Sequence, residues 1–293
     1  MNTRTNTTGM LCILMTLIAS CCVFAQGYKV DWNCTNSGGG VMSAGGYKVN
    51  GTIGQPATGF TKNTSFLHWI GFWSGEVPAP TVAPTVAAAK LLANGTFISV
   101  SGKIATSAEW EFPGFFYLEE SDRSSGIRVA FPVGAVSGLD RERSVVSVLG
   151  TMDTSPMGER QIAAAVIVIT STNPIAIGPL GMNNRTLGGG DFGIPPLGQY
   201  GITNGVGLNN VGLLVRTWGR VSYVDDVYMT ISDGSSGVMP DGTTGGVRVS
   251  TAQLAIQLPN EGDYISVIGI SSLYLSGAVQ TPEVLPRDFF DVN

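Results

Sequence analysis

The sequence contains a single histidine, His68, and this limits the chemistry that the chain can perform. Hydrolases with a serine or cysteine nucleophile need a neighbouring imidazole to take up the proton. Residues 91–293 contain no histidine, so that stretch cannot hold such a site. We expect His68 to be an ordinary residue on the surface of a strand.

Carboxylates are the remaining candidates for acid–base chemistry. They form two sequence clusters, Glu109, Glu111, Glu119 and Glu120 in one and Asp225 and Asp226 in the other. A glycosidase holds two carboxylates across a sugar cleft, but nothing in these spacings pairs any two. Asp233 and Asp241 could bind calcium, although both belong to Asp-Gly pairs, which are common in turns. No His/Cys cluster suits zinc. We therefore expect no catalytic residue, no metal and no cofactor.

Several short segments occur twice in the same order. Residues 121–126 (SDRSSG) return as 232–237 (SDGSSG), and residues 126–129 (GIRV) return as 246–249 (GVRV). Two further pairs flank them, residues 100–104 with 217–221 and residues 147–151 with 266–270. These matches lie 111 to 120 residues apart, which is the size of a small domain. We expect two copies of one fold.

Each copy has five segments that are rich in β-branched and aromatic residues and bounded by turn residues. The expected strands are 96–104, 115–119, 126–131, 144–152 and 162–170 in the first copy, and 212–224, 228–232, 246–250, 264–273 and a last stretch near 289–292 in the second. Gly102 and Gly219 lie in the first strands, and Gly150 and Gly269 in the fourth. Glycine inside a strand allows the sharp bends of a small barrel.

Five strands with these glycines resemble an OB-fold. The segments Pro179–Arg185, Leu187–Phe192 and Gly212–Val221 are similar to a group of exported bacterial proteins with tandem OB-like domains, and the similarity covers residues 90–293. Residues 27–75 resemble a Gly- and aromatic-rich module near the start of other exported bacterial proteins. The resemblance implies an all-β chain with two tandem OB-fold-like five-stranded barrels and a small N-terminal β-meander. By analogy alone, it also implies binding of nucleic acid or oligosaccharide.

OB-folds bind their ligands on strands two and three, beside the loops after strands one and four. There the chain offers aromatic and arginine side chains suited to stacking on bases or sugar rings: Trp110, Phe112, Phe115, Tyr117, Arg123 and Arg128 in the first copy, and Tyr223, Tyr228 and Arg248 in the second. The alternative is that about half of these aromatics fill the two barrel cores. Arg128 and Arg248 recur at matching places, as ligand contacts or as structural ion pairs to an acid on the first strands.

The N-terminus predicts export from a bacterial cell. Residues 1–25 have the pattern of a signal peptide, and residues 18–21 also resemble a lipobox, in which Cys21 would carry a lipid and supply the only membrane attachment. We expect a secreted, cell-surface or periplasmic protein. The other segments are a Gly/aromatic-rich β-hairpin module (26–75), a Pro-rich linker (76–90), OB-like domain 1 (91–172), a Gly/Pro/Asn-rich connector (173–204) and OB-like domain 2 (205–293).

Both copies are acidic. Residues 91–172 carry six Lys and Arg against nine Asp and Glu, and residues 205–293 carry four against nine. This balance disfavours general nucleic-acid binding, although one basic face could reverse it. We predict a non-enzymatic exported protein whose barrels bind a polymer, either an oligosaccharide or a single-stranded nucleic acid. The alternative is a structural or assembly protein of the cell surface that binds other proteins through the N-terminal β module.

Overall fold

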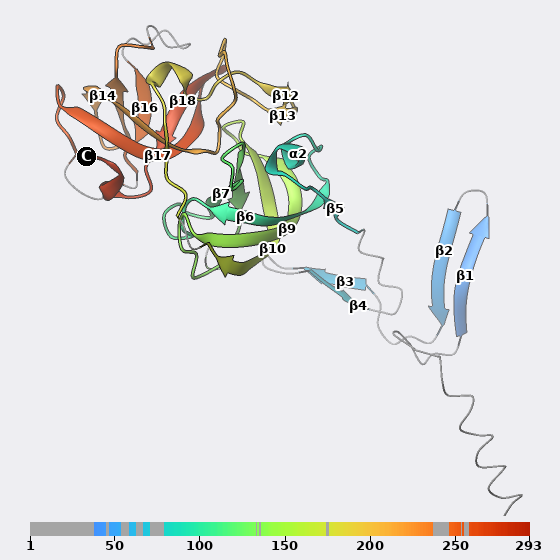
Figure 1. Ribbon diagram of the computed structural model, residues 1–293. Coiled ribbons are helices and arrows are strands. Elements are labelled where there is room, and N and C mark those ends of the chain that lie inside the picture. The colour runs from blue at the N-terminus through green and yellow to red at the C-terminus, as the bar shows by residue number, and fades with distance from the viewer. Residues whose placement is uncertain are drawn as a thin grey trace, which may run out of the picture. The chain divides into compact units, whose positions relative to one another are not determined.

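The structure is a computed structural model that describes residues 38–44, 47–53, 59–62, 67–70, 79–132, 134, 136–173, 176–236, 246–252, 254 and 258–293 (Figure 1). The expected signal peptide, Cys21 and Asp241 lie outside these residues. The chain divides into two compact units, of which the first holds residues 1–62 and 67–76 and the second holds residues 63–66 and 77–293. Within the described residues, no helix is both long and apolar enough to cross a membrane.

Two hairpins are described near the N-terminus. β1 (Gly38–Ala44) pairs antiparallel with β2 (Tyr47–Ile53), and β3 (Gly59–Lys62) pairs antiparallel with β4 (Leu67–Ile70), which contains His68. The alternating residues of these segments favour hairpins. The expected meander of residues 26–75 stays a prediction, because the described residues cover only these two pairs of strands.

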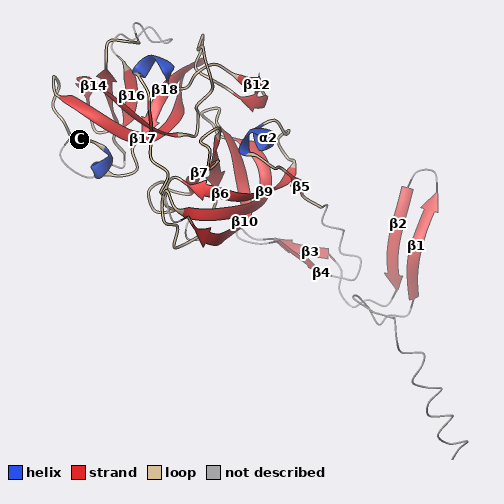
Figure 2. Cartoon of the chain, viewed as in Figure 1, coloured by secondary structure: helices blue, strands red, loops and turns tan. Residues whose placement is uncertain are grey.

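The second unit begins with a closed five-stranded barrel, which we call barrel 1. Its strands are β6 (Phe97–Ala105), β7 (Phe115–Glu119), β8 (Gly126–Ala130), β9 (Ser144–Thr154) and β10 (Arg160–Thr172). They pair in the order β6-β7-β8-β10-β9, with β8 and β10 parallel, and pairing of β6 with β9 closes the ring. The expected all-β class and a closed barrel are therefore confirmed (Figure 2).

The core of barrel 1 follows from the alternation along its strands. Every second residue of β9 from Ser144 to Met152 is buried, so Val146, Val148 and Met152 join one apolar cluster with Ile98 and Val100 of β6. The short strand β5 (Thr81–Val82) pairs with β6, and α2 (Val86–Lys90) follows, its first turn capped by the side chain of Thr85. Val86 and Ala89 of α2 add to the same cluster.

A second sheet, which we call sheet 2, has the same order of pairing. Its strands are β14 (Leu214–Val224), β15 (Tyr228–Ser232), β16 (Val247–Ser250), β17 (Tyr264–Ser276) and β18 (Val279–Leu285). They pair as β14-β15-β16-β18-β17, with β16 and β18 parallel, and β14 also pairs with β17. Residues 173–213 between the two sheets contain β11 (Leu180–Gly181), which pairs with β14, the 3-10 helix η1 (Asn184–Thr186), and the pair β12 (Phe192–Ile194) and β13 (Leu197–Gln199).

The expectation for the last strand of the second copy was wrong. Residues 289–291 form a 3-10 helix, η2 (Phe289–Asp291), and the fifth strand is β18, at residues 279–285. β18 contains Pro282 and Glu283, and proline and charge both weaken the sequence pattern of a central strand. β18 nevertheless pairs on both sides, because its contacts with β16 begin at Glu283, after the proline.

Gly102 and Gly219, in the first strands of the two sheets, have different structural roles. Gly102 has a φ of +71° at a register shift in β6, between its pairings with β9 at Val100 and at Lys103, so it permits the expected bend. Gly219 instead lies close to β15, where a Cβ atom would come within 2.6 Å of the carbonyl carbon of Ser232. In sheet 2, the glycine therefore allows close approach of two strands.

Barrel 1 and sheet 2 share a small apolar core inside the second unit. Phe112 and Tyr117 of barrel 1 pack with Leu214 and Ile270 of sheet 2, and all four are buried. Gly126 comes so close to Gly212 that a Cβ atom on it would lie 2.5 Å from the carbonyl carbon of Gly212. The two sheets are therefore packed directly against each other.

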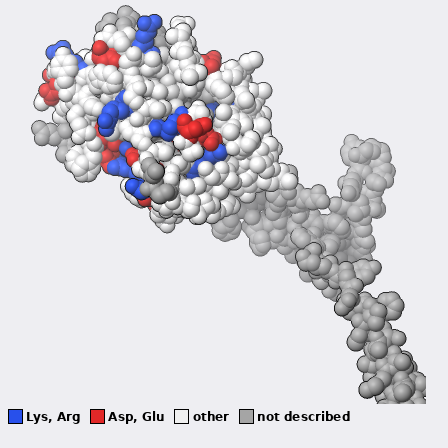
Figure 3. All heavy atoms as spheres, in the orientation of Figure 1, with Lys and Arg blue, Asp and Glu red and all other residues white. Residues whose placement is uncertain are grey.

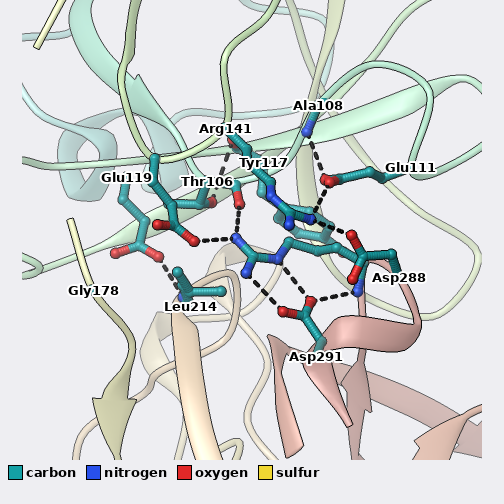
Figure 4. Close-up of polar contacts among 12 residues, drawn as sticks. Thr106, Ala108, Glu111, Tyr117, Glu119, Arg141, Gly178, Leu214, Asp288 and Asp291 are labelled. Carbon is teal, nitrogen blue, oxygen red and sulfur yellow. Dashed lines mark hydrogen bonds and ion pairs between the residues drawn. The ribbon is translucent and has the colours of Figure 1, made fainter. Parts of the chain in front are cut away.

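Ion pairs and hydrogen bonds surround this core (Figure 4). The buried guanidinium of Arg287 binds Asp291 through Nε at 2.9 Å, and its Nη1 donates to the carbonyl oxygen of Thr106 at 2.9 Å and to Glu142 at 2.7 Å. Arg141 of barrel 1 bridges Glu111 at 2.7 Å and Asp288 at 2.8 Å. The segment after β18 is thus fastened to barrel 1 by two arginines.

Candidate functional site

The first-copy candidates Phe115 and Tyr117 lie at the junction with sheet 2. Tyr117 is fully buried and donates its hydroxyl to Glu159 at 2.8 Å, and burial raises the pKa of its phenol well above the usual value. Phe115 and Phe112 stack with ring centroids 5.1 Å apart, beside the ring of Tyr117. These rings contact sheet 2, so they form no open platform.

Arg123 and Trp110 are also separate from any shared platform. The Nε of Arg123 donates to Glu119 at 2.7 Å, and its other nitrogens donate to the carbonyl oxygens of Gly178 and Leu214. Arg123 therefore ties barrel 1 to the chain that leads into sheet 2. Trp110 is 70% exposed, in the loop before β7.

The recurring arginines have the same kind of surroundings in both copies. Arg128 lies over the ring of Phe115 at 3.6 Å and is 3.7 Å from Glu159. Arg248 lies between two rings, 3.8 Å from Tyr228 and 4.0 Å from Tyr274. Its Nε donates to Glu283 at 2.8 Å. Glu159 directly precedes the fifth strand of its sheet, and Glu283 lies on the fifth strand of the other. The sequence-based alternative had placed the acids on the first strands.

Tyr223 extends the aromatic surface of sheet 2. Its ring centroid is 5.0 Å from that of Tyr228, and its side chain is 40% exposed. We call Tyr223, Tyr228, Arg248 and Tyr274 the Tyr–Arg stack. It brings together all three candidates of the second copy, with the partly exposed Tyr223 at its end.

The turn between β14 and β15 fixes Tyr223 and Tyr228. The Oδ1 of Asp225 accepts hydrogen bonds from the backbone amides of Val227 at 2.8 Å and Tyr228 at 2.7 Å. Its Oδ2 accepts the Tyr223 hydroxyl at 2.6 Å. This hydrogen bond raises the pKa of Tyr223 to about 12, so the phenol stays neutral at physiological pH. The stack therefore offers a flat neutral ring beside a carboxylate.

Sequence reasoning did not find Tyr274 and Glu283. Both belong to the β17–β18 hairpin, whose second strand was expected some ten residues later in the chain. The signal that could have found them is the hairpin turn at Gly277, which has a φ of +62°, between two segments of alternating residues.

Among the described residues, no three His, Cys, Asp or Glu side chains lie close enough to hold a metal ion. An open groove lined by Asp191, Tyr200 and Gln280 contains none of the candidate residues. No protein-family model matches the chain, and a search of curated proteins finds no significant match.

Proposed function

We propose that this protein is an exported, non-enzymatic binding protein with two OB-like barrels, and that the second barrel binds an oligosaccharide at the Tyr–Arg stack. The pairing order of sheet 2, with β14 joined to both β15 and β17, supports a second barrel of the same kind as barrel 1. The N-terminal resemblances support a secreted, periplasmic or cell-surface location, with a lipid on Cys21 as the only membrane attachment. The proposal includes no enzyme activity and no cofactor.

The partly exposed ring of Tyr223, at the end of the stack, is the observation that carries this proposal. Sugar rings stack on aromatic rings through their C–H groups, while their hydroxyls donate to nearby carboxylates such as Asp225. Arg248 strengthens the stack from inside, because two rings and Glu283 already hold its guanidinium. A ligand would therefore meet the tyrosines first. The acidity of residues 205–293 disfavours binding that depends on many phosphate contacts, as in general nucleic-acid binding.

The test is a binding screen of the full chain on a panel of immobilised glycans, with Tyr223→Ala as the key variant. Loss of one stacking ring should weaken binding about tenfold. Tyr200→Ala is the matched control, because Tyr200 is 37% exposed and lies outside the stack. Equal binding by the wild type and Tyr223→Ala, or binding by neither to any glycan, would remove this proposal.

Assembly with other protein chains is a second candidate function, favoured by the free edge of β10. β10 pairs with β8 only at Gln161–Ala163, so one edge of residues 164–172 has no described strand partner. Val166 is 48% exposed and Val168 is 49% exposed, and residues 161–172 contain no charge and no proline. Such an edge is a template for strand addition. The N-terminal module, which the sequence suggested for this role, has no described side-chain contacts.

The partner that fits this edge is a second copy of the chain, because two identical uncharged strands can pair without bringing like charges together. We expect the full chain to dimerise in sedimentation velocity, and Val166→Lys/Val168→Lys to remain monomeric. Val206→Lys/Leu208→Lys is the control, since these residues are 70% and 91% exposed but lie outside any strand. A monomeric wild type at 100 µM would argue against assembly through β10.

A further inference from the structure

Exposed arginines and aromatic rings alternate along the outer row of β14. Arg216, Trp218 and Arg220 are exposed, whereas Val215, Thr217 and Gly219 between them are buried. Residues two apart on a strand are about 7 Å apart on the same face. Tyr264 of β17 is paired with Arg220, so it lies on this face too, and it is 80% exposed. We call these four residues the β14 row.

The guanidinium groups of the β14 row differ from most others in the described chain. Ion pairs hold five other arginines: Arg123, Arg128, Arg141, Arg248 and Arg287. Figure 3 shows several of the basic side chains on one face lying directly against acidic ones. Within the described residues, no ion pair or hydrogen bond reaches the side chain of Arg216 or Arg220. In a chain of net charge −5, two unpaired arginines beside an exposed tryptophan form a surface suited to an anion.

The β14 row leads into the Tyr–Arg stack. The register of β14 against β15 shifts by one residue between Val221 and Tyr223. Before this bulge the exposed residues of β14 have even numbers, and after it Tyr223 is the exposed one. The bulge therefore keeps Tyr223 on the outer side, in line with Arg220 and Trp218. Tyr223 ends the row at the sugar site that we propose.

We infer that the oligosaccharide of the proposed function is part of an acidic polysaccharide, whose carboxylate or sulfate groups bind Arg216 and Arg220 while its rings stack on Trp218, Tyr264 and Tyr223. This inference rests on the proposed function and adds the ligand's charge and its direction along β14. An extended chain is required, because the row from Arg216 to Tyr223 spans about 20 Å or more at the rise of a strand.

Carboxylates beside the row favour an acidic sugar over a nucleic acid. Asp225 follows Tyr223 at the end of β14, and the exposed Asp263 precedes Tyr264. A phosphodiester backbone and a polyuronate both carry about one charge per unit, but the DNA backbone offers these carboxylates no hydrogen-bond donor. A polysaccharide has hydroxyls that can donate to Asp225 and Asp263, with anionic groups left for the two arginines.

The experiment compares three probes on the full chain: polygalacturonate, the same polymer with its carboxylates methyl-esterified, and a single-stranded dT oligonucleotide. We expect the wild type to bind polygalacturonate most tightly at 50 mM NaCl. Arg216→Gln/Arg220→Gln should raise the Kd for polygalacturonate about tenfold. High salt should reduce the difference in Kd between the wild type and this variant. The control, Lys48→Gln/Lys62→Gln, removes the same charge from β2 and β3 of the other unit and should bind like the wild type.

The outcomes separate this inference from the proposed function. Equal affinity for both polymers, unchanged in Arg216→Gln/Arg220→Gln but lost in Tyr223→Ala, would overturn the acidic ligand and leave the sugar site standing. Tighter binding of the oligonucleotide than of polygalacturonate would overturn the ligand class. Binding of neither polymer would also overturn the inference, and the glycan panel would then decide the proposed function alone.

Discussion

Glu283 is the acid on which the Tyr–Arg stack depends, and it is strongly desolvated. Its side chain is only 11% exposed, and burial raises the pKa of its carboxyl to about 7. The neighbouring Arg248 opposes this shift, and the charge of Glu159 across the junction adds to it. The same side chain thus holds the arginine in place and resists ionisation.

Because of this raised pKa, we expect the free energy of unfolding of the wild type to fall between pH 4.5 and 7. In that window the unfolded chain releases the proton of residue 283 while the folded protein retains it, so the free energy of unfolding decreases as pH rises, and it levels off above pH 7. Burial raises the pKa of Glu119 to about 7 as well, which adds to the slope. Glu283→Gln should remove the part of this decrease in unfolding free energy that Glu283 causes, on the order of 2 kcal/mol between pH 4.5 and 7.

Urea unfolding at pH 5, 6, 7 and 8 measures this slope. Glu261→Gln is the control, because Glu261 is exposed in the turn that precedes β17. The prediction is wrong if the wild type and Glu283→Gln lose stability in parallel between pH 5 and 7. Binding of a glycan is not the readout, since Glu283 also positions Arg248.

The three second-copy candidates lie together in the Tyr–Arg stack, whereas the first-copy rings are covered by sheet 2. Repetition selected Arg128 and Arg248, and both prove to stack on rings and pair with acids. The amino-acid sequence alone does not indicate that the aromatic residues of the first repeat are covered by the second repeat. That depends on contacts such as Tyr117 with Leu214, whose residues are almost a hundred positions apart.

At the scale of elements, strand positions followed from local pattern wherever alternation was regular. Two predicted strands, 115–119 and 228–232, coincide with β7 and β15. The strand after β17 was misplaced because β18 carries a proline and a buried glutamate, which a local pattern assigns to a loop. Long-range pairing with β16 and β17 overrides that local preference.

The start of β8 tests how closely the two sheets approach. A methyl group on Gly126 would lie 2.5 Å from the carbonyl carbon of Gly212 and 3.1 Å from the amide nitrogen of Leu213. Both are backbone atoms, so relief needs a shift of the chain before β14. We expect Gly126→Ala to destabilise the protein by about 2 kcal/mol in urea unfolding. Gly178→Ala is the control, since a Cβ there meets no atom within 4 Å, and equal stability of the two variants would contradict the prediction.

At the scale of the whole molecule, the second unit is more than a pair of repeated domains. The repeat in the sequence indicates two similar folds but says nothing of their junction. In the structure, the buried Lys90 of α2 donates to the carbonyl oxygen of Val211 at 2.9 Å, and Glu119 accepts from the backbone amide of Leu214. Separation would break these hydrogen bonds and expose the apolar core around Tyr117 and Leu214 to water, so it is costly.

We therefore expect barrel 1 and sheet 2 to unfold together. Arg287→Met removes the guanidinium that joins Asp291 to Glu142 and the carbonyl of Thr106, and it leaves the buried carboxylate of Asp291 with the backbone amide of residue 287 but no cation. The cost should be about 3 kcal/mol. Hydrogen exchange in a urea series, followed on peptides from β9 and from β17, should give one midpoint for both in the wild type and one lower midpoint for both in the variant. If the β17 midpoint falls while that of β9 stays, the sheets are energetically independent, since a shared core transmits the loss on one side to the other.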